Sequence, residues 1–314
     1  ETRVAELLKN PLTVDDAMQI ALFNNRGLQA SFAELGIAEA DLVQAGRMPN
    51  PGFSFGRLTR GSELELEHSV HLNLIGLLFT PFKSEMEQRR FQSVQNEVAA
   101  NALKLAAQTR KAYFVAVAAD ETVRYMKQVK EAADASAELA RRMAQTGNWN
   151  KLNQAREQGF YADAVLNLAR AEQAQIAARE QLTRLLGLWG EQIKFSLPER
   201  LPDLPKSVDD LPDIEQTAMA QRMDIAAMKT QTQALAKSLG LSKATRFINV
   251  LELGAVRNSS NEAPTQRGYE VSLELPLFDW GGAKVAKAEA IYMQALNRTA
   301  EAAVNARSEV REAY

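Results

Sequence analysis

The chain has 314 residues, of which 46% are hydrophobic and 24% are charged, with 37 lysines and arginines against 39 aspartates and glutamates. The resulting net charge of -2 gives no electrostatic reason to expect a nucleic-acid partner. Cysteine is absent, which excludes disulfides, thiolate metal ligands and cysteine nucleophiles together.

The longest apolar stretches are too short for a membrane helix. Residues 72–79 and 112–119 are examples, and both fall far below the roughly 18 residues that such a helix needs. If the chain crosses a bilayer, we expect it to do so with strands.

A first long helix is predicted from Thr13 to about Gly46. Thr13 suits the N-cap position, and Asp15 and Asp16 in the first turn complement the helix dipole. Apolar residues recur mostly at three- and four-residue spacing, and Gly46 precedes two prolines that end the pattern.

A β-hairpin is predicted over residues 52–79, with a turn at 59–62. From Glu63 onward apolar and polar residues alternate, which is typical of a strand with two different faces. Thr80 and Pro81 are expected to end it. One face carries Leu64, Leu66, Val70, Leu72 and Leu74, and the other carries Glu63, Glu65, Glu67 and His71.

Residues 82–187 predict a long helical hairpin. No proline or glycine occurs from Phe82 to Gln145, and about 63 helical residues at about 1.5 Å each would span roughly 95 Å. Such a rod must project from any compact domain. A turn is predicted at 146–148, followed by a returning helix from about Trp149 to Leu186.

The second half repeats the order of the first. After a connector at 198–212 with four prolines, we expect a helix at 213–241, a β-hairpin at 246–278 and a final helix running to Tyr314. The strand 268–278 places Tyr269, Val271, Leu273, Leu275 and Leu277 on one face.

Matching segments support this duplication. Leu78-Phe79 corresponds to Leu277-Phe278, and the sequence RKAY at 110–113 corresponds to REAY at 311–314. We therefore predict a first repeat at 1–197, the connector at 198–212 and an incomplete second repeat at 213–314. Completing the second repeat by the same rise per residue would need roughly 80–110 further residues.

Three segments resemble the TolC family of outer-membrane efflux proteins. PLFDWGGAKVAKAEA at 276–290 is similar to the family's strand-to-helix junction, and LARRMAQTGNW at 139–149 with LTRLLGL at 182–188 to its hairpin tip and returning helix. The chain departs from the family at Arg26 and Met223, where proline is common.

The resemblance implies a mainly α fold with β-hairpins, in which long periplasmic coiled-coil helices carry four strands per protomer. It implies a homotrimer with a shared twelve-stranded β-barrel in the outer membrane of a Gram-negative bacterium, in contact with its lipid. The implied function is a passive exit duct, served by a periplasmic adaptor protein and an inner-membrane pump. No catalytic activity and no cofactor are expected.

The resemblance also assigns roles to residues. The turn Thr146, Gly147, Asn148 and Trp149 would dock the adaptor, although it could simply reverse the chain. From the two-residue alternation we expect the apolar strand faces to contact lipid, and Glu63, Glu65, Glu67 and His71 to line the lumen or a solvated strand end. A metal site at His68 and His71 is not expected, because strand positions three apart point to opposite faces.

A soluble coiled-coil scaffold, or an adaptor-like protein without a channel, is the alternative. An adaptor would bury its strands in a globular domain and would not duplicate hairpin and helix. Phosphate loops, His-Glu metal motifs and serine elbows are missing from the sequence, which disfavours an enzyme.

Overall fold

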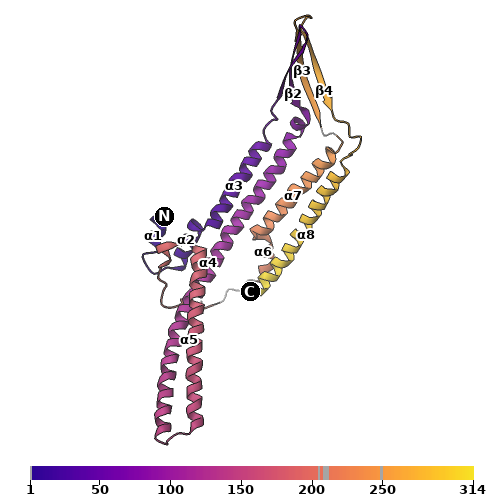
Figure 1. Cartoon of the computed structure of the whole chain (residues 1–314). Helices are drawn as coiled ribbons and strands as arrows, with labels where there is room; N and C mark the ends of the chain where they lie inside the picture. Colours follow the sequence, from indigo (N-terminus) through magenta and orange to yellow (C-terminus); the bar gives the residue numbers. More distant parts are fainter. Residues whose placement is uncertain (1, 204–205, 208–211, 248–249) are drawn as a thin grey trace. The chain divides into compact units, whose positions relative to one another are not determined.

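The computed structural model describes residues 2–203, 206–207, 212–247 and 250–314 (Figure 1). Parts of the predicted connector 198–212 and of the predicted β-hairpin 246–278 therefore lie outside the described residues. By internal packing the chain divides into two compact units, Glu1–Ser31 with Asn101–Asp210 and Phe32–Ala100 with Leu211–Tyr314. This division follows packing and not the predicted repeats, which stay a prediction.

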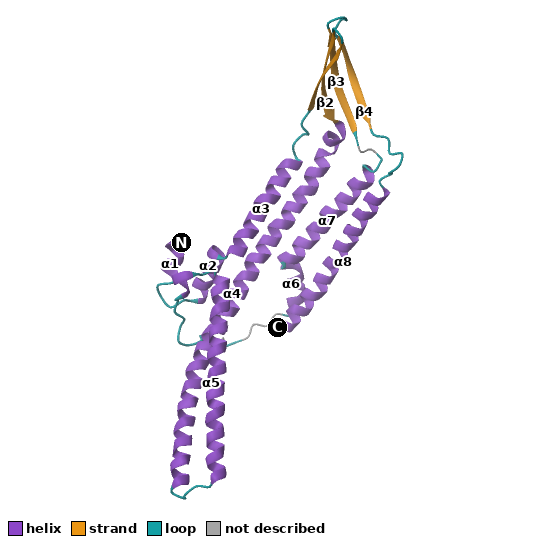
Figure 2. Ribbon diagram, viewed as in Figure 1, coloured by secondary structure: helices purple, strands orange, loops and turns teal. Residues whose placement is uncertain are grey.

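Most of the described chain is helical, and the strands form a single sheet (Figure 2). Within the described ranges, no helix combines the length and the apolar character needed to cross a membrane. The helices are α1 Thr2–Leu7, α2 Val14–Asn24, α3 Arg26–Ala45, α4 Leu74–Gln145, α5 Lys151–Leu186, the short 3-10 helix η1 Gly190–Ile193, α6 Ile214–Gln221, α7 Met223–Ala244 and α8 Gly282–Ala313.

The start of α2 confirms the predicted cap. The Thr13 hydroxyl accepts a hydrogen bond from the Asp16 amide at 3.1 Å, and the Asp16 carboxylate accepts one from the Thr13 amide at 3.4 Å. This reciprocal pair satisfies two of the amides that a helix start leaves without intrahelical partners.

The predicted single helix 13–46 was wrong, because the chain breaks between α2 and α3 at Asn25. The Asn25 backbone is extended there, with ψ 118°, and its side-chain oxygen accepts from the Leu28 amide at 3.1 Å, which caps α3. Its amide nitrogen donates to the Leu185 carbonyl at 3.0 Å. Asn25 thus caps α3 and also donates a hydrogen bond to a free carbonyl at the carboxyl end of α5. Helical periodicity in the sequence cannot show this second contact, because α5 is far away along the chain.

The neighbouring Asn24 explains why residue 187, at the end of α5, is a glycine. Its side chain donates to the carbonyls of Leu186 and Gly187 at 3.2 and 2.7 Å. Gly187 ends α5 with a φ of 66°, and a Cβ there would lie 2.7 Å from the Asn24 carbonyl oxygen. Both the left-handed backbone and the close approach therefore require glycine.

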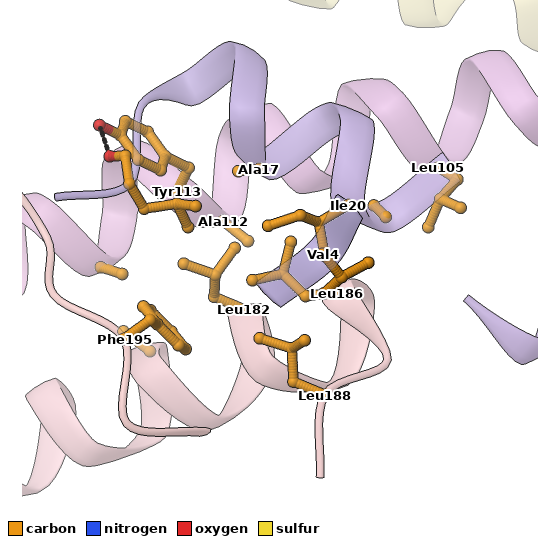
Figure 3. Packing of buried hydrophobic residues seen from close by; sticks show 14 of the residues in the cluster. Val4, Ala17, Ile20, Leu105, Ala112, Tyr113, Leu182, Leu186, Leu188 and Phe195 are labelled. Atoms are coloured by element: carbon orange, nitrogen blue, oxygen red, sulfur yellow. Dashed lines mark hydrogen bonds between the residues drawn. The ribbon is translucent and has the colours of Figure 1, made fainter. Parts of the chain in front are cut away.

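The first unit has an apolar core where α1, α2, α4 and α5 meet (Figure 3). Ile20, Leu182 and Leu186 are fully buried in it. The Tyr113 hydroxyl donates to the Leu12 carbonyl at 2.9 Å, which satisfies the one polar group that this side chain brings inside.

In the second unit hydrogen bonds and an ion pair join α4 to α7, and α7 runs beside α8 (Figure 1). The Ser93 hydroxyl of α4 donates to the Ala227 carbonyl at 2.8 Å, and the hydroxyls of Thr232 and Thr299 lie 3.0 Å apart between α7 and α8. The predicted helix 213–241 is divided into α6 and α7 at Arg222, whose guanidinium contacts Asp224 and Glu309, both at 2.6 Å.

The four strands form one antiparallel sheet in the order β1-β2-β3-β4. They are β1 Gly52–Arg60, β2 Glu63–Asn73, β3 Leu251–Ser260 and β4 Gln266–Leu273. Both predicted hairpins are present, and pairing of β2 with β3 joins them although about 180 residues separate the two strands in the chain.

The predicted ends of two strands were wrong. The segment 74–79, expected to continue β2, is the start of α4, because the Asn73 side-chain oxygen accepts from the Gly76 amide at 2.7 Å and caps the helix. Pro81 lies inside α4 and does not end the strand region. β4 ends at Leu273, so Leu275 and Leu277 follow the strand and lie outside it.

Candidate channel wall and docking turn

The register of the sheet places the predicted apolar positions on one face. Val70 of β2 lies opposite Phe53 and Ala255, and Ala255 lies opposite Tyr269 of β4. Because directly opposite residues share a face, the apolar positions of both hairpins coincide. We call this the apolar face, and of the predicted lipid-facing residues it contains Leu64, Leu66, Val70, Leu72, Tyr269, Val271 and Leu273.

The predicted lumen residues lie together on the other face. Glu63, Glu65, Glu67 and His71 occupy alternate positions of β2, on what we call the acidic face. His68 lies on the apolar face, so the two histidines are on opposite sides, as their spacing predicts.

Two further carboxylates of the acidic face were missed from the sequence. Glu252 lies opposite Asn73, and Glu270 lies opposite Gly254, which is itself opposite His71. Alternation shows that Glu270 points away from Tyr269 and Val271. Only the pairing of β2 with β3 shows that this is the face of Glu63, Glu65 and Glu67.

Side chains crowd on the acidic face. A Cβ on Gly52 would lie 2.5 Å from the His71 ring, and one on Gly56 would lie 3.3 Å from the Glu67 carboxylate. Gly254 is buried on the same face, whereas on the apolar face Tyr269 is 83% exposed and Val271 57% exposed. The crowding does not extend to β4, where a Cβ on Gly268 of the same face would meet nothing within 4 Å.

The turn predicted to dock a partner joins α4 to α5. Gly147 has a φ of 77°, and the Asn148 amide donates to the Met143 carbonyl at 3.0 Å. Asn150 then caps α5, accepting from the Asn153 amide at 2.8 Å. Thr146, Gly147 and Asn148 are exposed and Trp149 is half-buried, so the turn presents backbone and polar groups outward.

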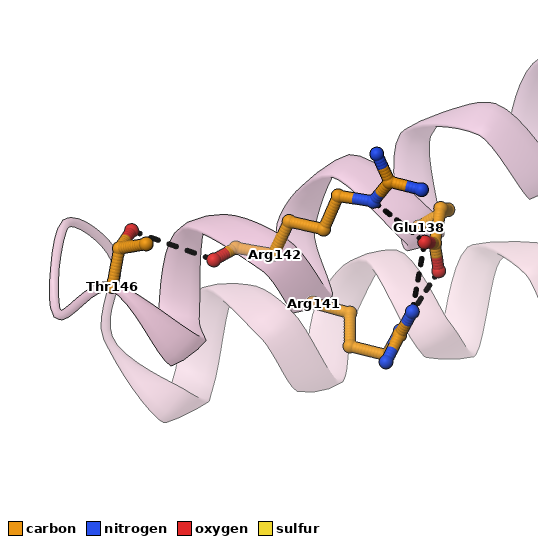
Figure 4. A network of polar contacts seen from close by, with 4 residues as sticks. All are labelled: Glu138, Arg141, Arg142 and Thr146. Atoms are coloured by element: carbon orange, nitrogen blue, oxygen red, sulfur yellow. Dashed lines mark hydrogen bonds and ion pairs between the residues drawn. The ribbon is translucent and has the colours of Figure 1, made fainter.

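An ion-pair cluster lies just before this turn (Figure 4). The Glu138 carboxylate accepts hydrogen bonds from Arg141 at 2.8 Å and from Arg142 at 2.7 Å. These hydrogen bonds lower the pKa of Glu138 to about 2. The cluster thus holds two guanidinium groups in the last two turns of α4, next to the turn at 146–149. The sequence shows the spacing of these charges, but it does not show that both arginines share one carboxylate.

Solved outer-membrane channels have this fold. The outer-membrane channel CmeC of Campylobacter jejuni superposes with a TM-score of 0.78 at 18% identity, over 95% of this chain and 69% of that one. VceC of Vibrio cholerae gives a TM-score of 0.74 at 15% identity, over 95% and 77% of the two chains. The chain has the fold of the TolC-family channels.

The sequence is also similar to that of a metal-resistance protein. The cobalt-zinc-cadmium resistance protein CzcC of Cupriavidus metallidurans is 24% identical over 278 residues, which are 86% of this chain. The chain spans 64% of the length of that relative. No family model matches. The family resemblance seen in the sequence and the predicted fold class are confirmed by the structural matches.

The TolC-type fold leaves the predicted residue roles as predictions. Leu74 begins α4, and Leu275 and Leu277 follow β4, so these three are not strand positions. The seven other predicted lipid-facing residues, the four lumen residues and the four turn residues occupy the elements expected of them.

Proposed function

We propose that this chain is a passive duct of the outer membrane, which carries substrates from a periplasmic adaptor and an inner-membrane pump to the outside. One observation carries the proposal. Two hairpins far apart in the sequence form a single sheet with one shared, mainly apolar face and one acidic face. A sheet built in this way suits a wall between lipid and a water-filled lumen.

The sheet needs partner strands. Among the described strands, β1 and β4 each pair on one side only, and lipid cannot satisfy their free backbone groups. Successive antiparallel strands alternate in direction, so β4 of one copy can pair antiparallel with β1 of the next. Three copies of four strands would close a twelve-stranded barrel, and rotational symmetry makes the three contacts identical.

The same assembly assigns a place to the helices. The helices would continue from the barrel into the periplasm, and the exposed turn Thr146–Trp149 would meet the adaptor. The geometry that supports docking is the reversal of the chain at Gly147, where a Cβ would meet nothing within 4 Å. A protruding, sterically open turn can enter a groove on a partner.

Cations are the proposed cargo class. Glu63, Glu65, Glu67, Glu252 and Glu270 share the acidic face, and among the described strand residues of that face Arg60 is the only arginine or lysine. Repeated around a threefold axis, these carboxylates would give the lumen a negative potential. The name of the relative CzcC, a cobalt-zinc-cadmium resistance protein, is consistent with this class.

Extraction and conductance of the full-length protein test the duct. We expect the protein to stay in the outer-membrane fraction after salt washes, to need detergent for release and to form ion-conducting pores in planar bilayers. Release by salt or buffer alone, with no pore activity, would instead favour a soluble coiled-coil scaffold or an adaptor.

Charge selectivity tests the cation proposal separately. Reversal potentials in a salt gradient should show a preference for cations, which weakens when Glu63, Glu65 and Glu67 are all replaced by glutamine. Gln266→Glu adds a carboxylate to the acidic face, so it should strengthen the preference for cations. Pores whose selectivity is the same in all three proteins would exclude this role for the face.

Docking is tested at the turn. Gly147→Trp should abolish efflux while trimers still reach the outer membrane, because the bulky ring would occupy the space of the partner. Gly159→Ala, an open position within α5, is the control and should leave efflux unchanged. Normal efflux by Gly147→Trp would leave Thr146–Trp149 as a plain turn.

A further inference from the structure

The apolar face is interrupted by a row that contains two arginines and a histidine. His68 of β2 lies opposite Arg257 of β3, and Arg257 lies opposite Arg267 of β4. We call these three residues the basic row. Arg57 of β1 lies on the same face, opposite Leu66 and thus one row nearer the strand turns.

Charge in the basic row is not balanced within the described chain. Directly opposite residues of an antiparallel pair have Cβ atoms about 4.5–5.5 Å apart, and like charges at that separation destabilise a sheet. Every strand carboxylate lies on the acidic face. Among the residues that the structure describes, neither Arg257 nor Arg267 forms an ion pair, and both are exposed.

The histidine adds a second unsatisfied group. The Nδ1 atom of His68 is buried and has no hydrogen-bond partner in the described chain. Its ring packs edge-on against Phe55, with ring centroids 5.2 Å apart. The row therefore consists of two guanidinium groups and one imidazole, which together can accept an anionic ligand between neighbouring strands.

The position of the basic row along the strands indicates which kind of anion it would bind. On β4 the row lies six residues from Leu273, with Val271 and Tyr269 between, which is about 20 Å of strand. The apolar band of a membrane barrel is about 25 Å tall and its strands are tilted. With that tilt, about 20 Å of strand rises only about 15 Å. The next positions of the face toward the strand turns include Arg57 and Ser259, so the row lies where the run of apolar positions ends and side chains suited to lipid headgroups begin.

We propose that the basic row binds the phosphate groups of anionic lipids, in the membrane leaflet nearest the strand turns. The proposal rests on the proposed function, because it needs the apolar face to contact lipid. Arginine binds phosphate through two parallel N–H groups, and a phosphate between Arg257 and Arg267 replaces their repulsion by attraction to a shared anion. A threefold assembly would carry three such sites around the barrel.

The experiment compares lipids in the full-length protein. Trimers are placed in nanodiscs of phosphatidylcholine, or of an equal mixture of phosphatidylcholine and phosphatidylglycerol. We expect wild type to unfold at a higher temperature in the anionic nanodiscs, and native mass spectrometry to detect retained phosphatidylglycerol. The double variant Arg257→Gln/Arg267→Gln should lose both effects.

Arg60→Gln is the matched control. Arg60 lies on the acidic face opposite Glu63, so its loss should leave both lipid effects unchanged. An equal lipid effect in wild type and the double variant would overturn the proposal. So would a stabilisation that inorganic phosphate reproduces in phosphatidylcholine nanodiscs, since the site would then take a free anion and not a lipid.

The two proposals fail in different ways. If wild-type protein does not insert and conduct, the proposed duct itself fails. If wild type and the double variant both insert and conduct, but neither distinguishes the two lipid mixtures, only the lipid site fails.

Discussion

The core of the first unit and the sheet of the second differ in what completes them. Leu182 and Ile20 in the core are 0% exposed, and their neighbours all come from the same chain. On the sheet, Tyr269 is 83% exposed although the face around it is apolar. The core is finished by its own side chains, whereas the sheet presents an apolar surface and open edges that other molecules must cover.

This contrast separates two sources of stability. A packed core is sensitive to lost volume in any solvent, because the cavity remains whatever surrounds the protein. An apolar sheet face is sensitive to added charge only where lipid replaces water. Substitutions in the two regions should therefore respond differently to the presence of a membrane.

The largest effect is expected in the core. Leu182→Ala should lower the free energy of unfolding by about 2–5 kcal/mol, because it leaves a cavity among fully buried neighbours. Val165→Ala, at a position 40% exposed on the same helix, should change it by less than about 0.5 kcal/mol. Denaturant unfolding in detergent and in lipid checks both. If Leu182→Ala lowered the free energy of unfolding only in lipid, the core would not be stabilised independently of the membrane.

The sheet should show the opposite dependence. Leu72→Arg should cost about 2–4 kcal/mol on folding into vesicles if it lies near the middle of the bilayer. Ser272→Arg on the acidic face, opposite Glu252, should cost much less because that side chain meets water and a carboxylate. Folding yields into vesicles measure the two variants. Equal yields would mean that the apolar face does not contact lipid.

A smaller effect is expected where α5 ends. Gly187→Ala should cost about 1–3 kcal/mol, because alanine would adopt a left-handed backbone and its Cβ would press on the Asn24 carbonyl. Gly190→Ala has a similar φ of 61° but nothing within 4 Å of its Cβ, so it isolates the backbone part of the cost. The midpoint temperature of thermal unfolding should be lower for Gly187→Ala than for Gly190→Ala. The reverse order would show that the close approach of Asn24 does not require glycine at position 187.

The smallest effect concerns protonation beside the docking turn. The pKa of Glu138 is lowered to about 2 in the folded chain by its hydrogen bonds to Arg141 and Arg142. A lowered folded pKa favours the folded state above the ordinary carboxyl pKa, and this contribution is lost as the pH falls toward 2. An NMR titration should place the Glu138 midpoint near pH 2 in wild type and higher in Arg141→Gln. Midpoints that coincide would show that the arginines do not hold this carboxylate.

Elements with strong local signals could be predicted from the sequence. The Thr13 cap, the helical hairpin with Gly147 in its turn, and both β-hairpins follow from residues that are close along the chain. So did the division of β2 into an apolar and a glutamate-rich side. In each case short-range sterics and alternation favour one local structure.

Distant contacts decided the rest. Asn25 breaks a periodic helix because it also satisfies the end of α5. The start of α4 is a local exception, because Asn73 caps the Gly76 amide three residues on and overrides the apolar alternation that suggested more strand. The register of β2 with β3 added Glu252 and Glu270 to the acidic face and aligned His68, Arg257 and Arg267 into one row. Alternation gives each strand two faces, but only hydrogen bonding between strands from opposite ends of the sequence determines which faces coincide.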